Sequence, residues 1–139
     1  MDWLTAAHVL TTFAMTGLIW FVQIVHYPML ARFGPESFGD IEREHCDRTG
    51  FVVAPLMLVE AATALLLWLS GWREVWFIVS LGLLALIWIS TAVLQVPLHR
   101  RLLLGRDERA LRRLVLTNWV RTVAWTARSA CLVVVISAR

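Results

Sequence analysis

The chain has 139 residues, of which 59% are hydrophobic, and its mean hydropathy of +0.69 is typical of integral membrane proteins and excludes an ordinary soluble domain. Its formal net charge of +3 comes from arginine alone, because the sequence contains no lysine. Since these arginines flank apolar segments, we expect them to contact the headgroups of a lipid bilayer and expect no nucleic-acid partner.

Four apolar stretches are each longer than the about 20 residues that a helix needs to cross a bilayer. Residues 3–31 and 75–99 contain no charge, 49–72 contains only Glu60, and 114–138 contains only Arg121 and Arg128. The sequence predicts helices at about 4–30, 48–70, 75–104 and 107–136. We expect the first to be an uncleaved helix, because it is too long for a signal peptide and lacks a basic leader. Residues 1–139 would then form a single integral membrane domain.

The connections between these stretches are short, which forces consecutive helices to run antiparallel. The fold class expected is therefore all-α, a four-helix transmembrane bundle with up-down-up-down topology. Gly34-Pro35-Glu36-Ser37 is expected to be a turn followed by a helix start, since Pro and Glu suit the first turn, and we expect residues 38–48 to form an interfacial lead-in to the second span. Gly105 ends the third helix, and Asp107 is placed to cap the fourth.

Arginines outside the spans are distributed unevenly between the two sides. Nine flank the first and third connections, and two lie on the opposite side: these are Arg32, Arg43, Arg48, Arg100, Arg101, Arg106, Arg109, Arg112 and Arg113 against Arg73 and Arg139. Positively charged loops remain in the cytoplasm. The pattern predicts both termini outside the cytoplasm, in a bacterial inner membrane.

Every predicted helix carries one polar stripe. The stripes hold His8, Gln23 and His26; His45 and Glu60; Gln95 and His99; and Asn118, Arg121 and Arg128. Polar side chains are costly in hydrocarbon and usually face the interior of a bundle. Ordinary interhelical hydrogen bonding explains any single one of them, but a stripe on each helix predicts a polar interior.

Counting from the connections places three histidines, His26, His45 and His99, at one end of the bundle, with Asn118 and Arg121 somewhat deeper. Three prolines lie on the same side, Pro28, Pro55 and Pro97, and each frees a backbone carbonyl one turn earlier. We expect a cavity at this end.

The three imidazoles admit several interpretations. They could ligate iron, copper or zinc, they could transfer protons, or they could make ordinary interfacial hydrogen bonds. Glu60 could join them as a metal ligand if the second helix bends at Pro55.

The two arginines inside the fourth span need an internal anion. For Arg121 and Arg128 this could be Glu60, a substrate carboxylate or phenolate, or a haem propionate. A structural ion pair from Glu60 to one of them is the alternative to a role in binding.

Several short motifs resemble those of the anthrone oxygenase-like membrane family. They are Thr16-Gly17, Tyr27-Pro28-Met29-Leu30, Phe38, Ala54-Pro55, Val96-Pro97-Leu98-His99, Leu103 and Asn118-Trp119-Val120-Arg121-Thr122. The resemblance implies a four-helix membrane protein, with some members oxidising anthrones, and it selects Pro97, Asn118 and Arg121. The chain differs at His99, where that family has asparagine.

A fainter similarity links the chain to membrane protoporphyrinogen oxidase and copper-resistance type bundles. It consists of His8 early in the first helix, Trp20, and the exit Tyr27-Pro28. If that similarity holds, it implies that His8 is an axial haem ligand, and Arg128 would then be available for a propionate.

Together these features predict a membrane oxidoreductase or oxygenase that acts on a lipophilic aromatic or quinone-like small molecule. Asn118, Arg121 and Gln95 would hold the substrate, and His26, His45, His99 and Glu60 would bind iron, copper or haem. The alternative is a non-catalytic subunit that binds haem, pigment or partner chains, as a homo-oligomer or within a larger membrane complex.

Overall fold

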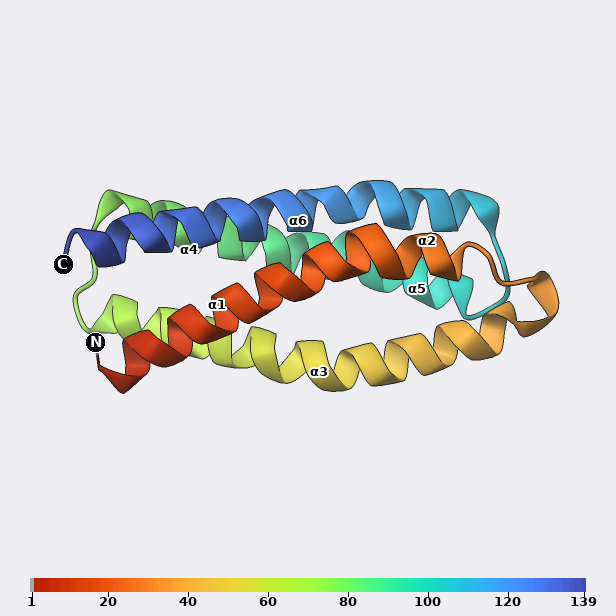
Figure 1. Ribbon diagram of the computed structural model, residues 1–139, viewed down its shortest axis with the longest axis horizontal. Helices are drawn as coiled ribbons and strands as arrows, with labels where there is room; N and C mark the ends of the chain where they lie inside the picture. Colours follow the sequence, from red (N-terminus) through yellow and green to blue (C-terminus); the bar gives the residue numbers. More distant parts are fainter. Residues whose placement is uncertain (1) are drawn as a thin grey trace.

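The computed structural model describes residues 2–139, and within them the chain forms four long helical rods and no strand. The first rod comprises α1 (Trp3–Phe21), η1 (Val22–His26) and α2 (Tyr27–Leu30), and the second is α3 (Pro35–Leu69). The third comprises α4 (Val75–Ser90), η2 (Thr91–Gln95) and α5 (Val96–Leu102), and the fourth is α6 (Glu108–Ser137). Figure 1 shows the rods lying alongside one another with both termini at one end. The predicted all-α four-helix bundle is confirmed.

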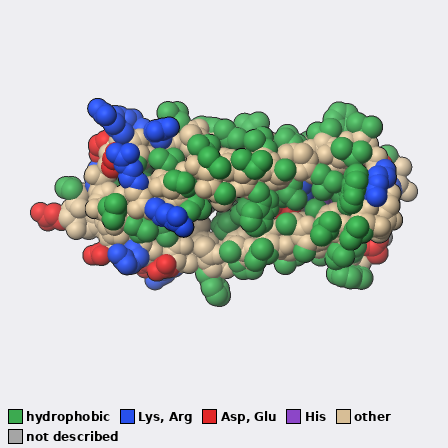
Figure 2. Space-filling view, turned by 180° about the vertical axis from the view of Figure 1, so that it is seen from behind, with side chains coloured by type: hydrophobic (Ala, Val, Ile, Leu, Met, Phe, Trp, Pro, Cys, Tyr) green, Lys and Arg blue, Asp and Glu red, His purple; other side chains and the backbone are tan. Residues whose placement is uncertain are grey.

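All four rods are long and apolar enough to cross a membrane, which makes the chain an integral membrane protein. Large apolar side chains such as Leu10, Leu65, Ile89 and Val123 are more than half exposed, as expected for a surface in contact with lipid. Figure 2 shows this apolar covering, with arginines gathered at one end of the molecule. We call this the loop end, because connections 31–34 and 103–107 lie there, and the opposite end the terminal end.

Glycine and aspartate residues determine where the turns between rods occur. Gly71 and Gly105 have φ of 99° and 133°, which only glycine adopts readily. The Asp107 carboxylate accepts hydrogen bonds from the backbone N–H groups of Arg109 and Ala110, both at 2.9 Å. The bond from Ala110 holds the pKa of Asp107 below its ordinary value. Asp107 is therefore the N-cap of α6, as predicted.

The helix start predicted at Pro35 is confirmed, because α3 begins there with Gly34 as its N-cap. The interfacial lead-in expected over residues 38–48 is instead part of the bundle. Phe38, Glu42 and His45 share one helical face and are buried against the other rods. The other charged side chains of this segment are exposed, which explains its interfacial character in the sequence.

Two of the three loop-end prolines lie next to an interruption of α-helical geometry, and both have the same position relative to it. Pro28 and Pro97 are each the second residue after a five-residue π-helical segment, η1 or η2. At the end of each segment the backbone N–H of Tyr27 or Val96 donates to the carbonyl five residues earlier. Pro55 differs from these two, since α3 remains α-helical on both sides of it. The π turns alter which side chains face the interior at the loop end.

Helix packing is tighter on one side of the bundle than on the other. α6 packs against α1, α4 and α5, whereas α3 packs mainly against α1 and meets the third rod chiefly through α5. An apolar core cluster around Trp125 and Met15 fills the middle of the molecule. This arrangement leaves room between α3 and the third rod near the loop end.

Candidate functional site

Two clusters of buried and partly buried polar side chains lie at different depths. The terminal cluster consists of the buried residues His8, Glu60, Thr63, Ser80 and Arg128. The histidine cluster, at the loop end, consists of buried Glu42 and His45 and partly buried His26, Cys46 and His99. Arg121 lies between them and lines a cavity.

The terminal cluster is centred on a fully buried ion pair. Arg128 Nε donates to Glu60 Oε1 at 3.0 Å, and its other nitrogens donate to the Ser80 carbonyl and to His8 Nε2, at 2.8 and 3.1 Å. Trp125 Nε1 donates to the second oxygen of Glu60 at 3.2 Å. The structure therefore favours the ion-pair alternative for Glu60, with Arg128 rather than Arg121 as its partner.

The contacts of His8 specify its tautomer. A guanidinium only donates hydrogen bonds, so His8 Nε2 must accept from Arg128. His8 Nδ1 then carries the proton and donates to Thr63 Oγ1 at 2.8 Å, and Thr63 in turn donates to the Val59 carbonyl. Both ring nitrogens of the residue suggested as a haem ligand are thus engaged by protein groups, as is Arg128.

Glu60 is not brought to the histidines. Because α3 is continuous through Pro55, the 15 residues between His45 and Glu60 correspond to about 22 Å along the helix. Glu60 pairs with Arg128 in the terminal cluster instead of joining the histidines.

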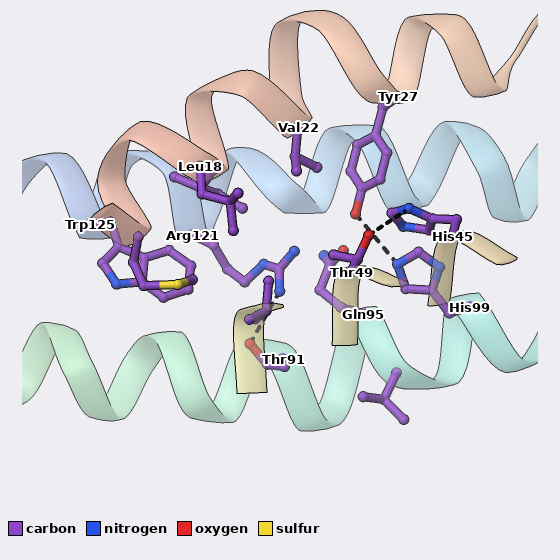
Figure 3. Close-up of a pocket in the computed structure, with 14 residues that line it drawn as sticks. Leu18, Val22, Tyr27, His45, Thr49, Thr91, Gln95, His99, Arg121 and Trp125 are labelled. Atoms are coloured by element: carbon purple, nitrogen blue, oxygen red, sulfur yellow. Dashed lines mark hydrogen bonds between the residues drawn. The ribbon is translucent and has the colours of Figure 1, made fainter. Parts of the chain in front are cut away.

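The three loop-end imidazoles lie close together, and Figure 3 shows two of them, His45 and His99. The His26 and His45 rings stack with centroids 4.2 Å apart, and the His45 and His99 centroids are 5.3 Å apart. His45 Nδ1 is hydrogen-bonded to Thr49 Oγ1 at 2.9 Å. His26 lies at the edge of the bundle, and its Nε2 is buried without a hydrogen-bond partner among the described residues.

His99 is also held by two residues that we did not predict from the sequence. Its Nδ1 lies 2.5 Å from Glu42 Oε1, and its Nε2 lies 3.5 Å from the Tyr27 hydroxyl. Glu42 has no exposed surface, and its second oxygen has no partner among the described residues. Phe38, Glu42 and His45 are spaced four and three residues apart, which places them on one helical face, so the sequence pattern could have indicated that Glu42 faces the interior. Tyr27 faces the interior after the extra residue of the η1 turn, which the sequence does not reveal.

Arg121 is buried without a carboxylate partner among the described residues. It is 8% exposed, and its Nε and one terminal nitrogen donate to Asn118 Oδ1 at 3.0 and 2.5 Å. The other terminal nitrogen lies 3.4 Å from Thr91 Oγ1, and Asn118 Nδ2 donates to Gln23 Oε1 at 2.8 Å. Its contacts are therefore to neutral groups, and its charge is left without a counter-ion in this part of the chain.

A cavity of about 110 Å³ lies between Arg121 and the histidines. Seven of its lining residues are apolar: Met15, Leu18, Ile19, Val22, Val53, Val96 and Trp125. The other seven are polar: Tyr27, His45, Thr49, Thr91, Gln95, His99 and Arg121. Figure 3 shows the Arg121 guanidinium and the His99 ring at opposite ends of this group of side chains.

The cavity adjoins a larger and more open hollow of about 320 Å³ between α3 and the third rod. The two share five lining residues: His45, Thr49, Val53, Val96 and His99. The hollow connects the cavity to the outer surface of the bundle between α3 and the third rod. Gln95, which was predicted in the site, lines the cavity and leaves its Oε1 without a partner among the described residues.

Fold and site together define a small four-helix integral membrane protein with a half-polar cavity at its loop end. Comparisons with protein-family models, with curated proteins and with solved structures found no match. Its function is therefore proposed from the geometry of the site.

Proposed function

We propose that this protein is a membrane-embedded oxidoreductase that acts on a lipophilic aromatic compound bearing an acidic oxygen, of the quinol or anthrone type. The observation that carries the proposal is Arg121, a buried guanidinium without a counter-ion among the described residues, which lines a cavity whose other lining residues are half apolar. The motif resemblance noted in the sequence points to the same class of substrate.

A buried charge that lacks a counter-ion destabilises a protein unless something compensates it. The phenolate or enolate oxygen of a bound compound would supply the missing negative charge and accept hydrogen bonds from the planar guanidinium. Because such charge develops as the substrate loses a proton, Arg121 would stabilise the reacting state more than the neutral substrate. Trp125 and Met15 would contact the aromatic rings.

The opposite end of the cavity holds groups suited to proton transfer. The Tyr27 hydroxyl and His99 Nε2 lie 3.5 Å apart and both line the cavity. An imidazole nitrogen that carries no proton can act as a general base. A substrate held at Arg121 would have this pair within the same cavity to accept the proton released on oxidation, with dioxygen or a bound redox metal as the electron acceptor.

Turnover by purified protein in lipid nanodiscs tests the proposal. Anthrone- and quinol-type compounds should raise the thermal stability of the protein and should be oxidised with saturable kinetics, followed as oxygen uptake and product absorbance. The O-methyl ethers of the same compounds serve as matched controls, because they keep the rings and lose the acidic oxygen, and they should bind at least about tenfold more weakly. Absence of both stabilisation and turnover would contradict the proposal.

Orientation of the site follows from the arginines that crowd the loop end, which we place in the cytoplasm. An alkaline phosphatase reporter fused to the C-terminus should then be active, because it lies outside the cytoplasm. A reporter that is active only in the cytoplasm should be active when it is inserted at residue 105. The opposite pattern would place the cavity at the other face of the membrane.

A further inference from the structure

Glu42, Cys46 and His99 bring three different metal-ligating groups together beside the cavity. Glu42 and Cys46 are one turn apart on α3, so their side chains share a face, and His99 comes from α5. A carboxylate oxygen, the Cys46 Sγ and an imidazole nitrogen all lie within 4.8 Å of one another. We propose that these three residues bind one divalent first-row transition-metal ion.

The hydrogen bonds of Glu42 show where the ion would go. Both the Cys46 thiol and His99 Nδ1 approach the same oxygen, Glu42 Oε1, at 3.5 and 2.5 Å. The other oxygen is buried and has no partner among the described residues. A metal ion would bind Cys46 as the thiolate, releasing its proton to solvent, and would bind His99 through Nδ1 with the imidazole proton on Nε2; it would also engage the second oxygen of Glu42. It would supply the positive charge that a fully buried carboxylate requires.

Little movement is needed to form the site. In a tetrahedral zinc-type centre the metal lies about 2.0–2.3 Å from its ligands, so ligand atoms are roughly 3.3–3.8 Å apart. Atoms that already lie within 4.8 Å of one another reach this spacing by side-chain rotation. Both helices can keep their backbone positions.

The donor set selects the class of metal. Thiolate, imidazole and carboxylate together suit Zn²⁺, Co²⁺ or Fe²⁺ and are unsuited to Mg²⁺ or Ca²⁺, which prefer oxygen ligands. Three protein ligands leave at least one coordination position open, as in catalytic rather than structural sites. Cys46 and His99 both line the hollow of about 320 Å³, which provides access to that position.

The site differs from the one that the sequence predicted. Only His99 belongs to both, while His26, His45 and Glu60 are replaced by Glu42 and Cys46. The proposal that a metal ion binds here depends on this geometry alone. A role for the bound ion in turnover rests on the proposed function.

Cobalt titration of the full-length, metal-depleted protein in detergent tests the inference. One equivalent of Co²⁺ should produce visible d–d bands and a near-ultraviolet thiolate-to-cobalt charge-transfer band. Cys46→Ser should remove the charge-transfer band, and Glu42→Gln or His99→Gln should weaken Co²⁺ binding at least about tenfold. Circular dichroism and size-exclusion elution establish that each variant is folded.

Three variants serve as controls. Cys131→Ser changes the other cysteine, which lies in the terminal half of α6, and His26→Gln and His45→Gln change the other loop-end histidines. All three should keep the charge-transfer band. A wild-type protein without the band, or a band that is lost in Cys131→Ser and kept in Cys46→Ser, would overturn the inference.

The same variants separate this inference from the proposed function. Arg121→Gln should keep the cobalt d–d and charge-transfer bands while losing substrate binding. Cys46→Ser should lose the charge-transfer band while keeping the stabilisation that the substrate produces. If the wild-type protein binds Co²⁺ but no substrate, the proposed function is wrong. If it binds substrate but no Co²⁺, the metal site is wrong.

Discussion

Replacing Arg121 with glutamine should lower kcat/KM for a quinol- or anthrone-type compound at least about 100-fold, the usual effect of losing one donor to a developing oxyanion. Glutamine keeps much of the length and a hydrogen-bond donor but removes the charge that balances the substrate anion. Arg121→Lys should restore part of the activity, because lysine keeps the charge and loses the planar donor geometry. Oxygen uptake in nanodiscs measures all three proteins.

The matched control is Arg112→Gln, which makes the same change at an exposed position of α6. It should leave kcat/KM unchanged. Arg121→Gln should also unfold no more easily than wild type, because it removes a buried charge that has no counter-ion among the described residues. A marked loss of stability with unchanged kcat/KM would show that Arg121 has a structural role instead.

Replacing Arg128 with methionine should have the largest effect on stability, with an expected loss of about 3–5 kcal/mol in the free energy of unfolding. The substitution leaves the Glu60 carboxylate fully buried without its cation. It also removes the donors to His8 and to the Ser80 carbonyl. Unfolding by SDS in mixed micelles, followed by circular dichroism, measures the difference.

The double variant Glu60→Met/Arg128→Met provides the control for this ion pair. It should recover most of the stability, because no unpaired charge is left in the interior and two apolar side chains fill the space. If the double variant were as unstable as the sum of the two single variants, the pair would contribute through packing rather than through charge.

Hydropathy and capping residues were sufficient to predict the four spans and most of their ends. Long apolar runs leave no alternative to membrane helices, and Gly105 and Asp107 have the local geometry that their residue types favour. The burial of residues 38–48 was not predicted, because Phe38 and Glu42 are covered by other rods and local composition does not report such tertiary contacts.

The contents of the site were harder to predict than its location. Pro28, Pro55 and Pro97 look alike in sequence, yet only the first and third follow a π turn. The turn at η1 brings Tyr27 into the bundle and leaves His26 at its edge, a rotation that a regular helical period cannot anticipate.

Ion-pair partners also depend on tertiary structure. Arg121 and Arg128 lie on one stripe of α6, seven residues apart, and either could have paired with Glu60. The choice depends on how far α3 is shifted along its axis relative to α6, and the chain length between these helices does not specify that shift.

Photo-cross-linking is the most direct test that the cavity is a binding site for a lipophilic compound. A quinol-type compound bearing a photoreactive azide, incorporated in nanodiscs and followed by peptide mapping, should label residues of the cavity wall such as Leu18, Val53 and Gln95. An excess of the unmodified compound and the Arg121→Gln substitution should each suppress the labelling. Labelling confined to outward-facing residues such as Leu65 and Ile89, unchanged in both cases, would contradict the proposal.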